Sequence, residues 1–222
     1  MKILYRSLLI LFILLSQSKE SYCQDTTKFF ISYDFIKGII NEPSLTFGYY
    51  LTPHHFVTLS LGYTYDHKSI REAICSLSPN QDTYPFMVYQ GPTVRTSYAY
   101  QLGPTFYLGA DFFYKYLQYD DHEFLNSESG GEVSFIRNEK AKVFGGHYNI
   151  GFMKLLPDSR LLINPSIGLG LTYKHRVYTT KDVHRMYDFY GEIPQEGTFT
   201  KNMWYTSLLF NLNFGLNLLK KK

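Results

Sequence analysis

This chain of 222 residues contains few cysteines and tryptophans, and its net charge is small. It contains two cysteines and one tryptophan, and its formal net charge is +3. A charge this small for the length argues against an electrostatic nucleic-acid binder. Two cysteines allow at most one intramolecular disulfide, so the chain is not a disulfide-rich scaffold. Internal repeats, low-complexity tracts and long runs of charge are absent as well.

Long apolar runs are also scarce, and the most prominent one lies near the N-terminus. Lys2 and Arg6 precede the apolar residues 8–15. This run is too short for a transmembrane helix, which needs about 20 residues. Its position after two basic residues fits the hydrophobic region of a secretory signal peptide. The chain is therefore predicted to be exported, and no later run approaches the length of a membrane-spanning helix.

A cleavage site is predicted before Gln24, because Ser21 and Cys23 place small residues three and one positions ahead of it. The predicted segments are a signal peptide, 1–23, and one domain, 24–222. Retention of Cys23 as a lipidated residue is the alternative, although the bulky Tyr22 does not suit a lipoprotein signal. Loss of Cys23 would leave Cys75 alone, which excludes an intramolecular disulfide.

What the chain does have is a regular alternation of large apolar and small polar residues. The closing stretch "SLLFNLNFGLNLLKKK" places Phe210, Leu212 and Phe214 on one parity, and asparagine or glycine on the other. A period of two is typical of a β-strand whose two faces meet different surroundings. Eight segments share this character: 29–35, 44–51, 56–66, 93–102, 106–118, 143–154, 161–175 and one that begins at about 203.

The connections between these segments alternate in length. Short ones that contain turn-forming residues are 52–55, 103–105 and 155–160. Long polar ones lie between them, at 67–92, 119–142 and 176–202. Strands that run up and down would place the short turns at one end of the fold and the long loops at the other.

The two parities indicate a protein with its polarity reversed. In a soluble antiparallel sandwich, which is the alternative, the water-facing parity is rich in lysine and glutamate. Here the polar parity is mostly glycine, serine, threonine and asparagine, with few charges. A closed barrel pairs its backbone groups and can present apolar side chains to hydrocarbon. The pattern therefore predicts an all-β fold: an eight-stranded antiparallel up-and-down transmembrane β-barrel with short periplasmic turns and long extracellular loops.

Tyrosine and proline positions bear on this register. Five tyrosines lie toward the long-loop ends of their segments, where an aromatic girdle would meet lipid head groups: Tyr63, Tyr65, Tyr114, Tyr116 and Tyr173. Tyr49 lies at the short-turn end, as a second girdle requires. Pro165 falls inside a predicted strand and cannot donate a ladder hydrogen bond, so a bulge or a late start of pairing is expected there.

With this architecture the chain resembles the small eight-stranded outer-membrane barrels of Gram-negative bacteria over residues 29–219. Its terminal "FNLNFGLNLL" is similar to the C-terminal strand that the barrel assembly machinery reads, although it ends in leucine and "KKK" instead of an aromatic residue. The resemblance implies an outer-membrane location. It also implies two partners, the lipid bilayer and, during biogenesis, the assembly machinery.

The interior of an eight-stranded barrel is narrow enough for its own side chains to fill. By parity, eight residues are predicted to form an interior polar network: Asp34, Asp66, Arg95, Asp111, Lys115, His147, Asn149 and Lys174. If Gln101 pairs with Thr105, Arg95 lies opposite Asp111. Because buried charges need partners, the favoured interpretation is an ionic plug. A narrow porin-like channel lined by the same groups is the alternative.

Aromatic residues cluster in two of the long loops. The candidate binding residues there are Phe86, Tyr89, Tyr187, Phe189 and Tyr190. Loops on a rigid scaffold commonly carry binding, and aromatic residues are enriched at protein interfaces. The expected role is therefore structural or binding, through adhesion or docking to an envelope or surface protein. Packing of the loops on one another is the alternative.

No catalytic residue, metal site or cofactor is predicted, and a lipid A-modifying enzyme is kept as a further alternative. One lipid A deacylase family carries a histidine two residues before its nucleophilic serine and an asparagine after it. His67-Lys68-Ser69 has that spacing, but Ile70 replaces the asparagine. His147-Tyr148-Asn149 lacks the serine. Other neighbouring bases and possible metal ligands are more typical of solvated surface: Asp120-Asp121-His122, Asp182-Val183-His184 and His54-His55.

Overall fold

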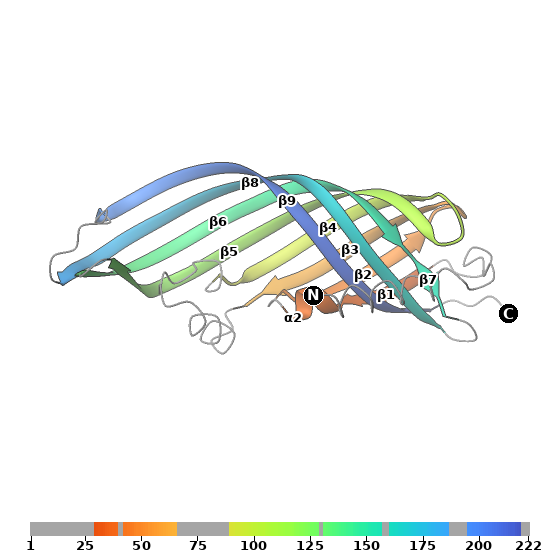
Figure 1. The fold of residues 1–222 in the computed structure, drawn as a ribbon, viewed down its shortest axis with the longest axis horizontal. Helices are drawn as coiled ribbons and strands as arrows, with labels where there is room; N and C mark the ends of the chain where they lie inside the picture. The colour runs from red at the N-terminus through yellow and green to blue at the C-terminus, as the bar shows by residue number, and fades with distance from the viewer. Residues whose placement is uncertain are drawn as a thin grey trace.

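The computed structural model describes residues 29–39, 42–65, 89–128, 131–156, 160–186 and 195–218. These residues form one antiparallel sheet and one short helix (Figure 1). The elements are β1 (Phe29–Asp34), α2 (Phe35–Ile39), β2 (Ser44–Tyr50), β3 (His55–Thr64), β4 (Gly91–Gln101), β5 (Phe106–Glu128), β6 (Gly131–Phe152), β7 (Lys154–Leu155), β8 (Leu161–Met186) and β9 (Gly197–Asn217). The predicted all-β class is confirmed. Among the described residues, no helix is long and apolar enough to cross a membrane.

Several predicted features lie outside these described ranges. They are the signal peptide over 1–23, Cys75, the His67-Lys68-Ser69 spacing, the interior residue Asp66, and the loop residues Phe86, Tyr187, Phe189 and Tyr190. The predictions for these residues stand as predictions.

The strands close into a ring. Each strand from β1 to β5 pairs antiparallel with the next strand along the chain, so that the pairs run from β1–β2 to β5–β6. Strand β6 then pairs with β8, β8 pairs with β9, and β9 returns to β1. The two-residue strand β7 pairs with β8 alone among the described residues. The predicted antiparallel pairing of neighbours in the chain is therefore confirmed, and the sheet has nine strands.

Pro165 belongs to β8 and lies opposite the point where the partner of β8 changes from β6 to β7. The ladder between β6 and β8 ends at the pair Gly151 and Ser166, and it resumes in β7 with Lys154 opposite Ile163. Pro165 falls in the gap between these pairs, so its missing N–H leaves no ladder hydrogen bond unmade on that side. On its other side it lies opposite Leu212 of β9. A local interruption of pairing accommodates the proline, as expected.

Four strands run well beyond their predicted ends. Strands β5, β6, β8 and β9 contain 23, 22, 26 and 21 residues. Figure 1 shows them projecting together past the shorter strands β1 to β4. The prediction of long loops over 119–142 and 176–202 is therefore wrong, because most of these residues belong to the hairpins β5–β6 and β8–β9. Strand residues there are largely polar on the outer parity, so the apolar contrast that marks the other segments is lost.

The two faces of the ring have the reversed polarity that the alternation predicts. Large apolar side chains of one parity are exposed, including Leu45, Leu61, Leu108, Leu169 and Phe210, at 42% to 59% of their surface. Small polar and charged side chains of the other parity are buried, including Ser32, Thr46, Ser60, Thr93 and Asp111. In a soluble protein, large apolar side chains are mostly buried and charged side chains are mostly exposed.

Two apolar clusters fill the interior at different heights. One lies near the short turns and consists of Phe30, Tyr50, Phe56, Ala99, Tyr107, Met153 and Leu162. The other lies toward the projecting hairpins and consists of Tyr89, Phe113, Tyr119, Phe124, Val133, Phe135, Ala141 and Val143. The charged residues described below lie between and beside these clusters.

Inward aromatic rings fit because glycines lie opposite them on neighbouring strands. Phe30 pairs with Gly48, and Tyr107 pairs with Gly151. A Cβ atom at Gly48 would lie 2.0 Å from the Phe30 ring, and one at Gly151 would lie 2.2 Å from the Tyr107 ring. Both distances are far below van der Waals contact, so any larger residue at either glycine would displace the ring.

Candidate functional site

The predicted interior residues converge inside the ring. Seven of the eight lie in the described residues: Asp34, Arg95, Asp111, Lys115, His147, Asn149 and Lys174. Asp34, Arg95, Asp111 and His147 are buried, and the other three are half-buried. Every one of the seven has a polar partner inside the ring.

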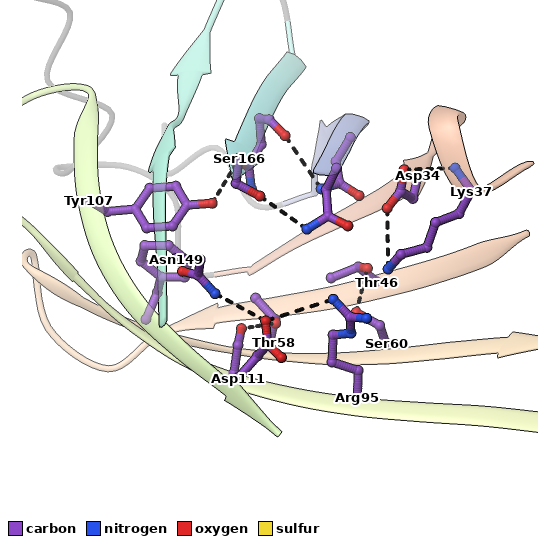
Figure 2. A pocket seen from close by; sticks show the side chains of 15 residues that line it. Asp34, Lys37, Thr46, Thr58, Ser60, Arg95, Tyr107, Asp111, Asn149 and Ser166 are labelled. Carbon is purple, nitrogen blue, oxygen red and sulfur yellow. Dashed lines mark hydrogen bonds and ion pairs between the residues drawn. The ribbon is translucent and has the colours of Figure 1, made fainter. Parts of the chain in front are cut away.

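Asp111 is the centre of one network. Its carboxylate lies 3.7 Å from Arg95 Nη1 and accepts a hydrogen bond of 3.1 Å from Asn149 Nδ2 (Figure 2). It also lies 2.9 Å from His147 Nδ1. The predicted register is wrong by two residues, because Gln101 pairs with Tyr107 and Arg95 lies opposite Phe113. Arg95 reaches Asp111 diagonally, since the long guanidinium arm spans the offset.

His147 continues the network toward β9. Its Nε2 atom lies 2.9 Å from Ser207 Oγ, which also lies 2.8 Å from Thr172 Oγ1. Asp111, His147 and Ser207 occupy one row across the sheet, in which Gly170 separates the last two. A Cβ at Gly170 would lie 1.9 Å from the Gly146 carbonyl oxygen. Only glycine fits there, and the imidazole therefore passes over β8 without meeting a side chain.

Ser207 and Lys37 are interior residues that the sequence analysis missed. Lys37 Nζ lies 3.3 Å from Asp34 Oδ2, and its backbone N–H donates to Asp34 Oδ1 over 3.2 Å. Asp34 is therefore the N-cap of α2, which is why the chain leaves β1 as a helix at this point. Ser207 has the inward parity of β9, so parity counted along that strand was the available signal.

A second network surrounds Glu139, whose side chain is fully buried. Arg176 Nη2 donates to it over 2.5 Å, Tyr119 donates over 3.1 Å, and Lys174 Nζ lies 3.8 Å away. Tyr89 also donates to this carboxylate. Two cations and two phenols thus neutralise and solvate one buried acid, as a buried charge requires.

Tyr89 was predicted as a candidate binding residue of a long loop, and the structure places its side chain inside the ring. Its side chain is 3% exposed, and its hydroxyl accepts a hydrogen bond of 2.8 Å from Lys174 while it donates to Glu139. Burial, reinforced by the adjacent Glu139 carboxylate, raises the pKa of Tyr89 far above its ordinary value. The phenol therefore stays protonated and fastens this segment to the interior.

Two cavities lie among these groups. The smaller, of about 50 Å³, lies between Asp34, Arg95, Tyr107 and Asn149 (Figure 2). The larger, of about 480 Å³, lies on the hairpin side. Its lining includes the cations Lys37, Arg95, Lys115 and Lys174, and a single carboxylate, Glu42, which pairs with Lys115. Cations therefore outnumber carboxylates in the lining of the larger cavity, and each of them is paired with an acid.

The other candidate pairs from the sequence lie apart from these cavities. Asp121 and Asp182 both have positive φ, of 43° and 52°, at irregularities in the strand ladders. Asp121 is exposed and lies 2.6 Å from Lys181. His55 Nδ1 lies 2.5 Å from the Tyr98 hydroxyl on the short-turn side. Within the described residues, no three histidine, cysteine, aspartate or glutamate side chains gather as metal ligands would.

Comparisons with known proteins give no match for this chain. No protein-family model matches it, and neither a curated protein nor a solved structure is similar to it. The fold and the interior networks therefore define it as a ring-shaped antiparallel sheet with a charged interior, and the function must be argued from those features.

Proposed function

We propose that this protein is an eight-stranded outer-membrane β-barrel with a closed interior and a structural or binding role. In this proposal β7 continues β6 beyond the interruption at Pro165, so the ring counts eight membrane-crossing strands. The short turns face the periplasm, and the hairpins β5–β6 and β8–β9 project outside the cell. The lipid bilayer surrounds the apolar outer face.

The observation that carries the proposal is the outer face itself. Four outward aromatic residues lie directly opposite one another on β5, β6, β8 and β9: Tyr114, Phe144, Tyr173 and Trp204. The ring centroids of Phe144 and Tyr173 are 4.9 Å apart, and those of Tyr173 and Trp204 are 4.8 Å apart. Such a row suits the level of the lipid head groups.

The outer face changes character at this aromatic row. On the hairpin side, the next outward residues of β6, β8 and β9 are Lys142, His175 and Asn202, which lie opposite one another. On the short-turn side, β9 exposes Leu208, Phe210, Phe214 and Leu216. A sharp boundary between an apolar band and a polar face is typical of a membrane interface. Monomeric soluble proteins rarely expose apolar patches of this extent.

The height of the apolar band fits a bilayer. On β9 it extends from Leu216 to Trp204, which is roughly 40 Å along the strand at about 3.4 Å per residue. A strand tilt of about 45° reduces this length to roughly 29 Å across the membrane. The hydrocarbon core of a bilayer is about 30 Å thick, so the band matches it.

A closed interior favours a structural or binding role over conduction. Along the axis lie, in turn, the apolar cluster around Phe30 and Tyr107, the Asp111 network, the larger cavity and the Glu139 network. A buried apolar layer and two paired charge networks oppose the passage of ions. These features favour a closed interior over the porin-like alternative.

The projecting hairpins supply the binding surface in this proposal. They form a rigid sheet beyond the aromatic row, and the predicted loop residues Tyr187, Phe189 and Tyr190 lie between β8 and β9. An envelope or surface protein would meet this sheet first. The assembly machinery would read β9, whose outward residues Phe214 and Leu216 are exposed, as is Leu218 directly after the strand.

Membrane extraction and gel mobility test the barrel. The mature chain is expected to stay in the membrane pellet after a urea wash, to dissolve in detergent, and to migrate faster on gels before boiling than after it. Purified protein in planar bilayers is expected to show no sustained open steps. A stable monomer in water without detergent would overturn the barrel, and sustained conductance would overturn the closed interior.

A hairpin replacement tests the binding role separately. Replacement of 181–196 by Asn-Gly would close β8–β9 with a tight turn next to the pair Thr180 and Gly197. A second variant keeps the hairpin and replaces only Tyr187, Phe189 and Tyr190 by serine. Both variants are expected to keep heat-modifiable mobility and to lose a cross-link to an envelope protein. A cross-link that survives in both variants would contradict the role of this hairpin.

A further inference from the structure

We propose that Asp111, His147 and Ser207 form a hydrolytic triad that cleaves a carboxylic ester of an anionic amphiphile inside the barrel. The proposal rests on the outer-membrane function above for the source of its substrate, and its geometry stands apart from that function. Ser207 is the nucleophile, His147 the general base, and Asp111 the residue that orients the imidazole.

The three side chains make the contacts that a serine nucleophile needs. Ser207 Oγ lies 2.9 Å from His147 Nε2, and Asp111 Oδ1 lies 2.9 Å from His147 Nδ1. The acid and the serine thus bind opposite nitrogens of one imidazole, which fixes the tautomer with its proton on Nδ1. Phe113 stacks on the ring, with centroids 5.2 Å apart and an interplanar angle of 14°. The base is therefore held in place on both its edges and one face.

Among the described serines, Ser207 alone lines the larger cavity, whereas Ser60, Ser97 and Ser166 line the smaller one. Ser207, His147 and Arg95 all line the cavity of about 480 Å³. Ser97 lies in the same row across the sheet as Asp111, but its hydroxyl bonds to Thr58 Oγ1 and it does not line this cavity. The larger cavity leaves room for a ligand beside the Ser207 hydroxyl.

The cavity lining defines the class of substrate. Its four cations and one carboxylate favour a ligand with a negative charge, such as a phosphate or carboxylate head group. Two buried nitrogens of Arg95, Nε and Nη1, have no hydrogen-bond partner among the described residues. Apolar side chains such as Leu117, Val143 and Leu209 line the same cavity and suit an acyl chain. An anionic lipid ester combines both features.

The proposal places a side opening of this cavity at the edge of β9, where the lining includes residues of both faces. Strand β1 ends at Asp34, which pairs with Asn213. The part of β9 that precedes Asn213 therefore has no β1 partner, and α2 lies beside it instead. The cavity is lined by inward residues of β9, such as Leu209, and by its outward neighbours Leu208 and Phe210. A cavity that contacts both faces of one strand passes around the free edge of that strand. The opening therefore lies in the apolar band, where an acyl chain would be found.

The reaction balances with water as the only co-substrate. Ser207 Oγ attacks the ester carbonyl and forms a C–O bond while His147 Nε2 takes the hydroxyl proton. The oxyanion of the tetrahedral adduct meets the cationic lining, which includes Arg95. Collapse breaks the bond to the alcohol, which leaves with the proton from His147. Water then attacks the acyl-serine by the same base, and the acid and the free serine are released.

Covalent labelling tests the nucleophile directly. Folded protein in detergent is treated with a fluorophosphonate probe, and the labelled residue is located by mass spectrometry. The probe is expected to label Ser207, and labelling is expected to be absent in Ser207→Ala and to fall by at least about a hundredfold in His147→Gln. The matched control, Ser97→Ala, removes an inward hydroxyl from the same row and is expected to label as the natural chain does.

Ester hydrolysis tests the substrate class. Nitrophenyl esters of short and long acyl chains and a phosphatidylglycerol micelle are the probes. Hydrolysis of at least one is expected, with a loss of roughly a thousandfold or more in Ser207→Ala. Heat-modifiable mobility of each variant shows that the ring is intact. If the folded natural chain neither labels at Ser207 nor cleaves any probe, the triad is overturned, whereas the barrel is judged by membrane extraction alone.

Discussion

A charge placed on the outer face distinguishes a lipid-facing barrel from a water-facing one. Ile167 lies at the middle of the apolar band of β8, between Leu161 and Tyr173, and is 46% exposed on the outer face. We expect Ile167→Arg to destabilise the protein strongly. In water, an exposed substitution of this kind changes stability by no more than about 0.5 kcal/mol.

The magnitude follows from the exposure and the environment. Full burial of an isoleucine side chain in an apolar phase is worth about 1.5–3 kcal/mol, so the exposed half of Ile167 contributes about 1 kcal/mol in lipid. An arginine at the bilayer midplane costs a further 2–4 kcal/mol, roughly. The expected loss in the free energy of unfolding is therefore about 3–5 kcal/mol.

The assay is a urea titration in lipid vesicles, read from the folded and unfolded bands on an unboiled gel. Thr200→Arg is the matched control, because Thr200 is exposed on the same face of β9, four residues beyond Trp204 on the hairpin side. Its expected cost is about 0–1 kcal/mol. Equal and small effects at both positions would refute the assignment of the outer face to lipid.

Three further predictions concern the interior. Asp111→Ala strands Arg95 without its anion and should lower the free energy of unfolding by about 3–5 kcal/mol, with partial recovery when Arg95→Met is added; an unchanged urea midpoint would contradict the ion pair. Gly151→Val would place a Cβ 2.2 Å from the Tyr107 ring and should lower the free energy of unfolding by at least about 1–3 kcal/mol in the same titration. No measurable loss would contradict the inward position of this ring. Because the pKa of Tyr89 is raised in the folded state, its contribution is complete below about pH 10, the pKa of an unfolded tyrosine, and is lost as the pH rises above it. Tyr89→Phe should therefore flatten the alkaline decline in stability measured by urea titrations at several pH values, and an identical decline in both proteins would count against the buried phenol.

Parity along the strands predicted which face each residue occupies, because one face of every segment is apolar and the other is small and polar. Leu59 and Leu61 are exposed, and Ser60 between them is buried, as the alternation requires. The strand ends were not predictable in this way. Beyond Tyr116 and Tyr173 the outer parity becomes polar, so hairpin and loop look alike in the sequence.

Register and interior packing were the parts that parity could not supply. Five residues lie between the paired residues Gln101 and Tyr107, instead of the three expected between Gln101 and Thr105. Arg95 therefore lies opposite Phe113 instead of Asp111, although its long side chain still reaches the acid. Inward aromatic residues such as Phe30 and Tyr107 were overlooked because aromatic rings were expected on the lipid side. Their signal was the glycine opposite each of them, and it becomes visible only when the pairing is known.

The aromatic row on β5, β6, β8 and β9 provides a reference level from which the height of the projecting hairpins can be estimated. Tyr114 to Glu128 covers 14 further residues of β5, and at about 3.4 Å per residue and a tilt of about 45° the hairpin tip stands roughly 30 Å above that level. In the proposed barrel, aromatic rings anchored at the head groups would hold this distance constant. A partner of that barrel would then bind the hairpin tips at a fixed distance from the lipid.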